Sequence, residues 1–381
     1  MKIAHLLVTG GWGGAERLAC ALAKRAQREG HLVSVDAAPL AQPGLARESF
    51  SGAGSERTLR SWARGARERL LAFAPDLVHA HLSTPAFAAT GVLAAHGFPS
   101  LVSLHLLPEK SWPNDFLVPL PSYLTLLAGA HAGPRWQLVA VSQCDRSRLS
   151  PWFGRGVRAV PNAPLDTLDT LDTTDDSDRA FVGAPLKLLC VGRLVAQKGI
   201  ERLLGALGSP RFANLDFRLL LVGDGEQRAE LQTIAKRPGL GARVQFIGSS
   251  HWQRAAKSAD LLICPSYYEG MPLVPMEGVL SGCPVVASSI PAHRELFGSV
   301  PGSLLPERER DWPAFLLALL SEPERCKELG RAQRRLAPRF TFDRMWDGYQ
   351  RLYLELTGAR SKRLESELKQ QAACASERHR A

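Results

Sequence analysis

The sequence predicts an α/β protein built from two doubly wound domains, each with a Rossmann-like parallel sheet. Three observations predict this class. The chain has 381 residues, 45% of them hydrophobic, which is enough for two domains with separate cores. Short apolar segments alternate with helical segments along most of the chain. The alternation stops at a polar, acidic segment and then begins again, so the two halves are expected to fold as separate domains.

The first domain is predicted to span residues 1–165 and to open with a β-loop-α-β unit. An apolar strand at residues 3–8 leads into the glycine-rich turn GGWGG, which precedes a helix at about residues 15–29 and a strand at residues 31–36. Further strands are predicted at residues 76–81, 100–105 and 138–142. Such alternation favours a parallel sheet covered by helices on both faces.

The second domain is predicted over residues 181–340, after an acidic linker at residues 166–180. Its strands are predicted at residues 186–191, 217–222, 244–247, 260–264 and 284–287. Residues 341–357 are expected to form a helix, because they carry a packing stripe at helical spacing. The stripe consists of Phe342, Met345, Trp346, Tyr349, Leu352 and Tyr353. The charged tail at residues 358–381 is expected to fray.

Composition narrows the compartment and the partners. The seven cysteines are scattered, odd in number and without metal-ligand spacing, which fits a reducing compartment. No signal-like segment and no run of about 18 apolar residues is present, so we expect a cytoplasmic protein without a membrane span. The net charge of +10 lies largely in the first half and indicates an anionic partner there. A phosphorylated substrate or the anionic inner face of a membrane fits this charge, whereas no nucleic-acid-binding module is found.

Two segments of the first domain have open interpretations. Four arginines lie on one face of a predicted helix, opposite an apolar face. The arginines are Arg57, Arg60, Arg64 and Arg67, and the apolar residues are Leu59, Trp62, Ala66 and Leu70. We favour an ordinary helix with a solvated basic face over a membrane-surface helix. Residues 106–136, rich in aromatic residues and proline, can form an acceptor or lipid contact or a packed insertion.

The most specific motif is EGMPLVPME, in which seven residues separate Glu269 from Glu277. Pro272 and Pro275 suit the first turn of a helix, where a missing N–H costs little. Glu269 is therefore expected in the loop before this helix and Glu277 about one and a half turns inside it. The free N–H groups at residues 271–273 would form an anion site, on which a diphosphate could rest between the two carboxylates.

The second motif is VGRLVAQKG, which ends the first strand of the second domain. Arg193 and Lys198 place two positive charges at the carboxyl end of a parallel strand, where open α/β sheets bind their ligands. Together they could neutralise a departing diphosphate.

These motifs, with LVGDGEQRAEL and the N-terminal GGAER, resemble the family 4 retaining glycosyltransferases over residues 3 to about 356. The resemblance implies the GT-B architecture, in which two Rossmann-like domains face an interdomain cleft and a C-terminal helix crosses back to the first domain. It implies a nucleotide-diphosphate sugar bound by the second domain and a glycan, lipid-linked or small-molecule acceptor bound by the first. Glycoconjugate or cell-envelope biosynthesis is the expected setting.

The resemblance also assigns roles to residues. Arg193 and Lys198 would bind the donor diphosphate, Glu269 would contact a hexose-type donor sugar, and Glu277 would bind the ribose. His105, which follows a first-domain strand, would lie near the transferred sugar. The expected catalytic residues are therefore Arg193, Lys198, Glu269 and His105. The expected donor-binding residues are Gly13, Gly14, Gly192, Gly223, Gly270, Met271, Pro272, Leu273 and Glu277.

Two positions depart from the family pattern: Gln197 replaces a frequent glutamate before the lysine, and Ala163 replaces a frequent glycine. These departures affect the expected contacts with the donor sugar and leave the expected phosphate contacts unchanged.

We expect no metal and no other cofactor, because no Asp-x-Asp follows a predicted strand and the aspartates of residues 166–178 fall in the linker. We expect retention, because no base is identified behind the sugar. A dinucleotide-dependent dehydrogenase is disfavoured, since neither glycine-rich turn satisfies G-x-G-x-x-G. A nucleotide-sugar epimerase is the nearest alternative. A non-enzymatic protein that binds anions or a membrane surface ranks last.

Overall fold

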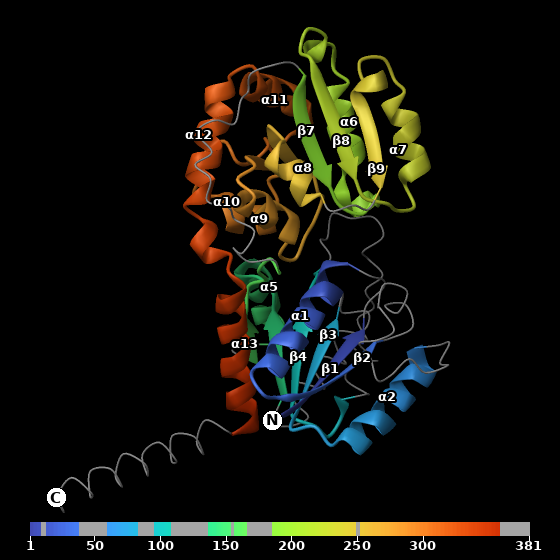
Figure 1. Cartoon of the computed structure of the whole chain (residues 1–381), viewed down its shortest axis with the longest axis vertical. Coiled ribbons are helices and arrows are strands. Elements are labelled where there is room, and N and C mark those ends of the chain that lie inside the picture. The colour runs from blue at the N-terminus through green and yellow to red at the C-terminus, as the bar shows by residue number, and fades with distance from the viewer. Residues whose placement is uncertain are drawn as a thin grey trace, which may run out of the picture. The chain divides into compact units, whose positions relative to one another are not determined.

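The computed structural model describes residues 1–8, 13–37, 59–82, 95–107, 136–153, 156–165, 185–248 and 252–358. They form two compact units (Figure 1). Unit 1 contains the chain up to Pro161 and again from Asp343, and unit 2 contains Asn162–Phe342. Each unit holds one parallel sheet, which confirms the predicted two-domain α/β class. The predicted acidic linker, Arg57, most of the aromatic stretch and the tail beyond Gly358 lie outside the described residues.

The unit 1 sheet has six parallel strands in the order β2-β1-β3-β4-β5-β6. The strands are β1 (Lys2–Val8), β2 (Leu32–Ala37), β3 (Leu77–Leu82), β4 (Ser100–Leu104), β5 (Trp136–Ala140) and β6 (Val157–Ala159). The first five lie close to the predicted segments. The sequence analysis did not predict β6, because three residues are too few to show an alternating pattern.

One face of this sheet carries an apolar core covered by α2 (Leu59–Phe73) and α5 (Gln143–Phe153). Trp62, Ala66 and Leu70 of α2 are buried in this core, as their predicted common face requires. The indole nitrogen of Trp62 donates a hydrogen bond to Asp36, 2.9 Å away. The apolar face of α2 therefore serves as ordinary packing surface.

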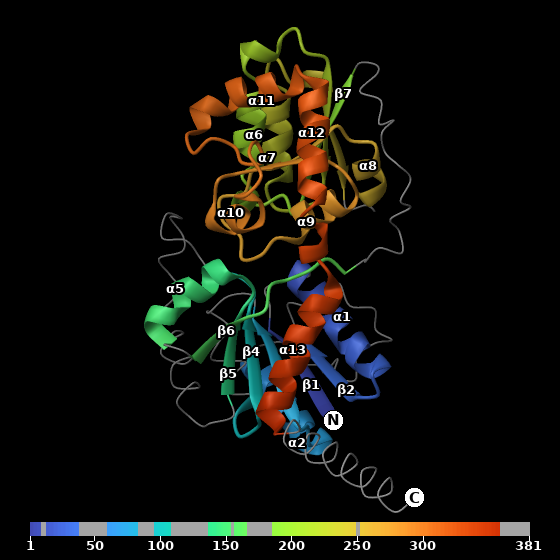
Figure 2. The same ribbon diagram turned by 90° about the vertical axis from the view of Figure 1, so that its left-hand side faces the viewer.

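The opposite face of the sheet is covered by α1 (Gly14–Arg28) and α13 (Phe342–Thr357), and Figure 2 shows α13 lying over the strands. The predicted stripe of α13 is buried, with Trp346 1% exposed and Tyr349 and Tyr353 fully covered. Arg25 of α1 pairs with Asp343 at 3.0 Å, which joins the two helices. The C-terminal helix thus returns to the first unit, as the predicted architecture requires.

The unit 2 sheet has five parallel strands in the order β11-β10-β7-β8-β9. They are β7 (Leu186–Val191), β8 (Phe217–Val222), β9 (Val244–Gly248), β10 (Leu261–Cys264) and β11 (Val285–Ala287). The helices are α6 (Ile200–Leu207), α7 (Arg228–Ala235), α8 (Gln253–Lys257), α9 (Leu273–Leu280), α10 (Pro291–Phe297), α11 (Trp312–Leu320) and α12 (Pro323–Arg334).

The strand order of this sheet reverses at β7. The next strand in sequence, β8, lies on one side of β7, and β10 lies on its other side. Open α/β sheets bind their ligands outside the carboxyl ends of the strands at such a point. A ligand site is therefore expected at the loops that follow β7 and β10. Among the helices described, none has the length and apolar character needed to cross a membrane.

Candidate functional site

Lys198 and Glu269 meet at the point where the strand order of unit 2 reverses. Lys198 ends a single 3₁₀ turn after β7, and Glu269 lies in the loop between β10 and α9. The Nζ atom of Lys198 lies 2.6 Å from Oε1 of Glu269. The side chains are only 20% and 10% exposed, so the pair is shielded from most solvent. Two of the predicted catalytic residues, drawn from different motifs, are therefore in direct contact.

Two further side chains complete this cluster. The hydroxyl of Ser266 donates to Oε1 of Glu269 over 2.7 Å. The amide of Gln197 donates to Oε2 of Glu269 over 3.4 Å and to the carbonyl of Tyr268 over 3.0 Å. The carbonyl oxygen of Gln197 accepts a hydrogen bond from Arg193, 3.4 Å away. One hydrogen-bonded group thus contains the three charged residues among the expected catalytic residues, which are Arg193, Lys198 and Glu269.

Gln197 has a physical reason to replace the frequent glutamate. The nitrogen of its side-chain amide donates to the carboxylate of Glu269, and the oxygen accepts from the guanidinium of Arg193. A second carboxylate at this position would repel Glu269 across the same distance. Gln197 appeared in the sequence only as a departure from the family pattern, because its contacts with Tyr268 and Glu269 cross between two loops. Ser266 was not predicted, although its contact with Glu269 is only three residues away in sequence.

Glu269 is held as a carboxylate. Burial opposes its ionisation, but the charge and hydrogen bond of Lys198, together with the Ser266 hydroxyl, outweigh burial and lower its pKa below the usual value. Glu269 therefore accepts hydrogen bonds at neutral pH and has no proton to donate. A sugar hydroxyl is a donor that suits such a group.

His293 of α10 lies beside this cluster and was not predicted. Burial lowers its pKa to about 4, so the ring is neutral at neutral pH. Its Nδ1 lies 2.9 Å from the carbonyl oxygen of Ser288 and therefore donates to it. The signal that could have found His293 is its place just after a strand at the edge of the same sheet.

The start of α9 offers backbone donors next to Glu269. Its N-cap, Pro272, is extended and no side chain of the described residues caps the helix. The first N–H groups, those of Leu273 and Val274, are therefore available to an anion. Asn162 donates to the carbonyl of Met271 over 3.1 Å and holds the preceding backbone. Pro272 and Pro275 lie at the helix start, as the sequence predicts.

Glu277 lies in the second turn of α9 and is 7% exposed. Glu269 precedes the helix in the loop after β10. This placement agrees with the prediction that Glu269 lies in the loop and Glu277 inside the helix.

The glycines at 192 and 223 bring two loops together. Gly223, with a φ of 144°, packs so closely that a Cβ atom there would collide with the carbonyl oxygen of Gly192. Gly225 is similarly packed against the backbone of Leu194. These glycines therefore fix the path of the loop that carries Arg193 and Lys198, in addition to the donor contact expected for Gly192 and Gly223.

The candidate residues of unit 1 lie at the ends of β1 and β4. Gly13 is the N-cap of α1, and its N–H donates to the Glu16 carboxylate over 2.7 Å, while Gly14 begins the helix. His105 follows β4 and is 8% exposed. Its Nε2 lies 3.2 Å from Nδ1 of His81. The preceding residues of the glycine-rich turn, 9–12, lie outside the described part of the chain.

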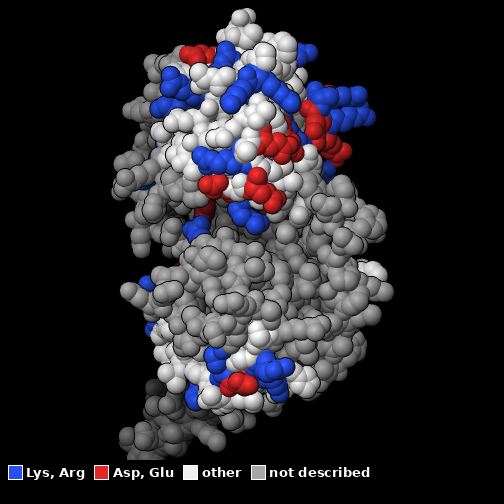
Figure 3. All heavy atoms as spheres, turned by 90° about the vertical axis from the view of Figure 1, so that its right-hand side faces the viewer, with Lys and Arg blue, Asp and Glu red and all other residues white. Residues whose placement is uncertain are grey.

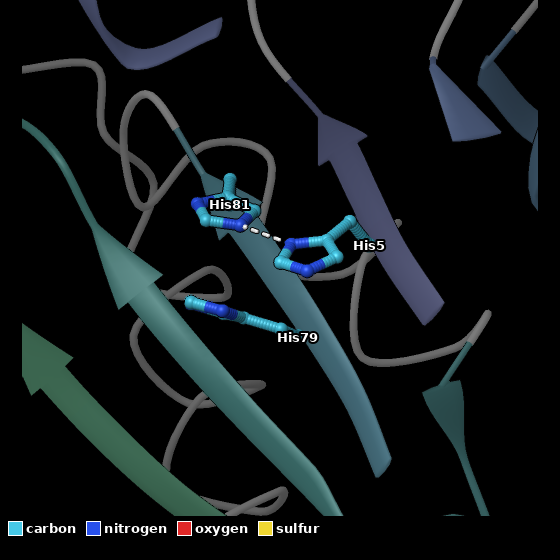
Figure 4. Close-up of side chains that lie close together, drawn as sticks. All are labelled: His5, His79 and His81. Atoms are coloured by element: carbon cyan, nitrogen blue, oxygen red, sulfur yellow. Dashed lines mark hydrogen bonds between the residues drawn. The ribbon is translucent and has the colours of Figure 1, made fainter. Parts of the chain in front are cut away.

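A cluster of three histidines behind His105 has the residue types of a metal site. One ring nitrogen from each of His5, His79 and His81 lies within 4.8 Å of the other two (Figure 4). The ring of His79 is tilted by 32° against that of His81, with centroids 3.9 Å apart. Its two nitrogens already bond Tyr353 (2.7 Å) and Ser103 (2.8 Å). Nδ1 of His5 and Nε2 of His81 share a hydrogen bond of 3.0 Å. Because these nitrogens are engaged with one another and with neighbouring side chains, a hydrogen-bonded cluster fits the three rings better than a shared ion.

Both halves of the chain match known families. Residues 173–336 match the glycosyl transferases group 1 family, and residues 12–163 match glycosyltransferase family 4. The D-inositol 3-phosphate glycosyltransferase of Segniliparus rotundus is 28% identical over 229 residues. That match covers 56% of this chain and 50% of the relative, so the chain spans about half the length of this relative.

Solved structures share the fold of the whole chain. Sucrose-phosphate synthase from Thermosynechococcus elongatus matches with a TM-score of 0.74 and 20% identity, covering 94% of this chain and 100% of that one. HepE from Anabaena in complex with UDP-glucose matches with a TM-score of 0.67 and 21% identity, covering 96% and 100%. At these identities the likeness establishes the two-domain fold.

Proposed function

The chain belongs to the family 4 type of glycosyltransferases with a GT-B fold, and from this premise we propose that it transfers a hexose-type sugar from a nucleotide-diphosphate sugar. The acceptor would be a glycan, a lipid-linked molecule or a small molecule. We propose that transfer retains the anomeric configuration and needs no metal ion. The observation that carries the proposal is the shielded Lys198–Glu269 pair beside the uncapped start of α9.

The donor diphosphate is the group that the positive charges would meet. Arg193 and Lys198 lie on the loop after β7, and the N–H groups at Leu273 and Val274 lie at a positive helix end. Together they offer an anion two kinds of partner without a metal. Uridine diphosphate sugars are the first donors to test, because Anabaena HepE was solved with UDP-glucose.

The donor sugar and the ribose would each contact one of the two carboxylates. Glu269 is ionised and would accept hydrogen bonds from sugar hydroxyls. Its Oε1 already accepts from Lys198 and Ser266, so it is suited to orient a sugar and poorly suited to attack carbon. Glu277, the second glutamate of the motif, would bind the ribose, as the family resemblance implies.

We propose the following chemistry for this site. The bond between the anomeric carbon and the diphosphate oxygen breaks while a bond to the acceptor oxygen forms on the same face of the sugar. The acceptor proton passes to the departing phosphate oxygen. Arg193 and Lys198 stabilise the charge that develops on that diphosphate, which is where catalysis by fixed electrostatics is most effective.

A nucleotide-sugar epimerase would bind the same donor and is the nearest alternative. A protein that only binds anions or membrane surfaces is the alternative from another class. On the face of unit 2 shown in Figure 3, the described Lys and Arg residues lie among Asp and Glu residues. A surface of mixed sign gives little support to charge-driven binding there, whereas the shielded Lys198–Glu269 group lies where open α/β sheets bind specific ligands.

The experiment that tests the proposal is incubation of the protein with a panel of nucleotide-sugars, with and without extracts of glycan and lipid acceptors. A transferase releases nucleoside diphosphate from one donor, slowly without acceptor and faster with it. An epimerase would instead give an isomeric nucleotide-sugar with its diphosphate intact. No turnover with any donor and extract, while anionic vesicles bind the protein, would overturn the proposal in favour of a binding protein.

A further inference from the structure

Three buried histidines form a hydrogen-bonded chain that ends at the candidate catalytic residue His105. Nδ1 of His5 lies 3.0 Å from Nε2 of His81, and Nδ1 of His81 lies 3.2 Å from Nε2 of His105. The three rings come from β1, β3 and the end of β4, which are neighbouring strands of one sheet. Figure 4 shows the first link of this chain, with His79 below it.

All three rings are neutral at physiological pH. Burial lowers the pKa of His5 to about 3 and that of His105 to about 4, and it lowers the pKa of His81 well below the usual value. A neutral imidazole has one N–H donor and one bare nitrogen acceptor. Each link of the histidine chain therefore needs a donor on one ring and an acceptor on the next. The two hydrogen bonds must then run in the same direction along the three rings, which means that all three rings carry the proton on the same nitrogen.

His5, at the end of the histidine chain opposite His105, sets that direction. Nε2 of His5 is buried and has no hydrogen-bond partner among the described residues. An orphaned buried N–H is rarer in proteins than an acceptor without a donor, so Nε2 of His5 is assigned as the bare nitrogen. The proton of His5 then lies on Nδ1 and is donated to His81. By the same logic His81 donates from Nδ1 to His105, and His105 carries its own proton on Nδ1.

The middle ring, that of His81, is held in place by residues that are not part of the histidine chain. The ring of His79 packs against that of His81, with centroids 3.9 Å apart, and is itself fixed by Tyr353 of α13 and Ser103 of β4. His81 is fully buried, which leaves its ring little freedom to turn. His105 is 8% exposed, and its Nδ1 forms no hydrogen bond within the described part of the chain. This nitrogen is the free end of the chain.

We propose that His81 is a positioning residue, which fixes the ring orientation and tautomer of His105 so that His105 offers an Nδ1–H donor to an oxygen of the transferred sugar. This inference rests on the proposed function and on the family resemblance, which implies that His105 lies near that sugar. Nothing in the motif comparison assigns a role to His5 or His81. The proposed role accounts for the contact of three buried imidazoles on this face of the sheet, which also holds the polar side chains of His79 and Ser103.

Nitrogen NMR of the full-length protein labelled in its histidines tests the chain without relying on activity. We expect His105 to carry its proton on Nδ1 in the wild-type protein, with His105→Gln used to assign the signals. In His81→Leu, which removes both links, the two tautomers of His105 should mix. In His81→Asn, whose amide can replace the Nδ1–H donor, the single tautomer should return. A His105 proton found on Nε2 in the wild-type protein would overturn the proposal.

Kinetics tests the consequence for transfer. Loss of one neutral hydrogen bond corresponds to about a tenfold fall in kcat/KM, which we expect for His81→Leu and largely not for His81→Asn. If His81 acts through His105, the double variant His81→Leu/His105→Leu should be no slower than His105→Leu alone. Additive losses would contradict this role. His96→Leu, at an exposed histidine of the same unit, is the matched control and should leave kcat/KM unchanged.

The two tests separate this inference from the proposed function. A protein with the expected tautomers but no turnover would contradict the transferase proposal and leave the histidine chain supported. A working transferase in which His81→Leu matches the wild type in kcat/KM would contradict the positioning role alone. Melting temperatures of each variant show whether a loss of turnover follows from unfolding.

Discussion

Lys198 and Glu269 are 71 residues apart in sequence, yet Nζ of one lies 2.6 Å from Oε1 of the other. Their contact joins the loop after β7 to the loop after β10, the two strands between which the sheet order reverses. The pair is largely buried and keeps Glu269 ionised. In the proposed function, the same contact would position a cation for a diphosphate and a carboxylate for sugar hydroxyls.

Removal of the cations should slow transfer strongly. Arg193→Ala and Lys198→Ala each take away a partner of the leaving diphosphate, an effect of about 3 kcal/mol or roughly a hundredfold in rate. Steady-state kinetics and far-UV circular dichroism would measure rate and fold together. Lys187→Ala, an exposed lysine near the start of β7, is the control and should turn over normally. Near-normal rates for both site variants would remove these residues from the site.

Chelation should leave activity intact. Because Arg193, Lys198 and the start of α9 are proposed to meet the diphosphate charge, no divalent ion is needed for the reaction. Turnover in excess EDTA should equal turnover in buffer, measured as nucleoside diphosphate release. Complete loss in EDTA that magnesium or manganese restores would refute the metal-independent mechanism.

Glu269 should contribute stability that depends on pH. Its pKa is lower in the folded state than in an unfolded chain, so its contribution is present above the unfolded pKa and is lost as pH falls through the folded pKa. Glu269→Gln should therefore melt below the wild type at neutral pH, with the difference shrinking on acidification. Thermal melts from pH 7 to pH 3 measure this. Glu328→Gln, at an exposed glutamate of α12, should show no such trend, and a constant difference for Glu269→Gln would count against the ion pair.

Removal of α13 should unfold unit 1. A chain ending at residue 340 loses Trp346, Tyr349 and Tyr353, all nearly or fully buried. Loss of each such aromatic costs about 3–5 kcal/mol, and the sum rivals the whole stability of a typical domain. Calorimetry should show loss of one melting transition, whereas a control chain ending at Gly358 keeps α13 and should keep both. An unchanged melting profile after truncation at 340 would show that α13 adds no stability.

A subtler variant probes the same helix. Tyr353→Phe removes the hydroxyl that bonds His79 over 2.7 Å and leaves a buried ring nitrogen without its partner. Such a loss costs about 1–3 kcal/mol, and we expect a lower urea midpoint with an unchanged slope. Equal midpoints for variant and wild type would mean that this bond contributes nothing to stability.

The fold followed from local patterns, but the site did so only in part. Alternating apolar strands predicted both sheets, and the spacing of Trp346, Tyr349 and Tyr353 predicted a buried helix face. The return of α13 to the first domain was implied by family resemblance alone, since a stripe does not specify its partner. The contact between Lys198 and Glu269 likewise needed the strand order, which no local pattern contains.

Most of the residues that sequence analysis missed share one physical cause. Gln197 and His293 lie beside Glu269 because separate loops and a helix come together, and the histidine chain depends on which strands are neighbours. Ser266 is the exception, since it contacts Glu269 within one loop, where a lone serine gives no signal in sequence. The two histidines of the segment HAH share a face because side chains alternate along a strand. Only the pairing of β3 with β1 and β4 brings His81 within reach of His5 and His105.

Proton NMR of the transfer product tests the central claim most directly. The donor is the α-linked nucleotide-sugar that the panel identifies, and the acceptor is the one that most increases its turnover. The proposed same-face attack, with the departing diphosphate taking the acceptor proton, predicts an α product with a small anomeric coupling. A β product would mean attack from the opposite face by an acceptor that a base activates, and it would contradict the same-face mechanism in which the departing diphosphate takes the acceptor proton.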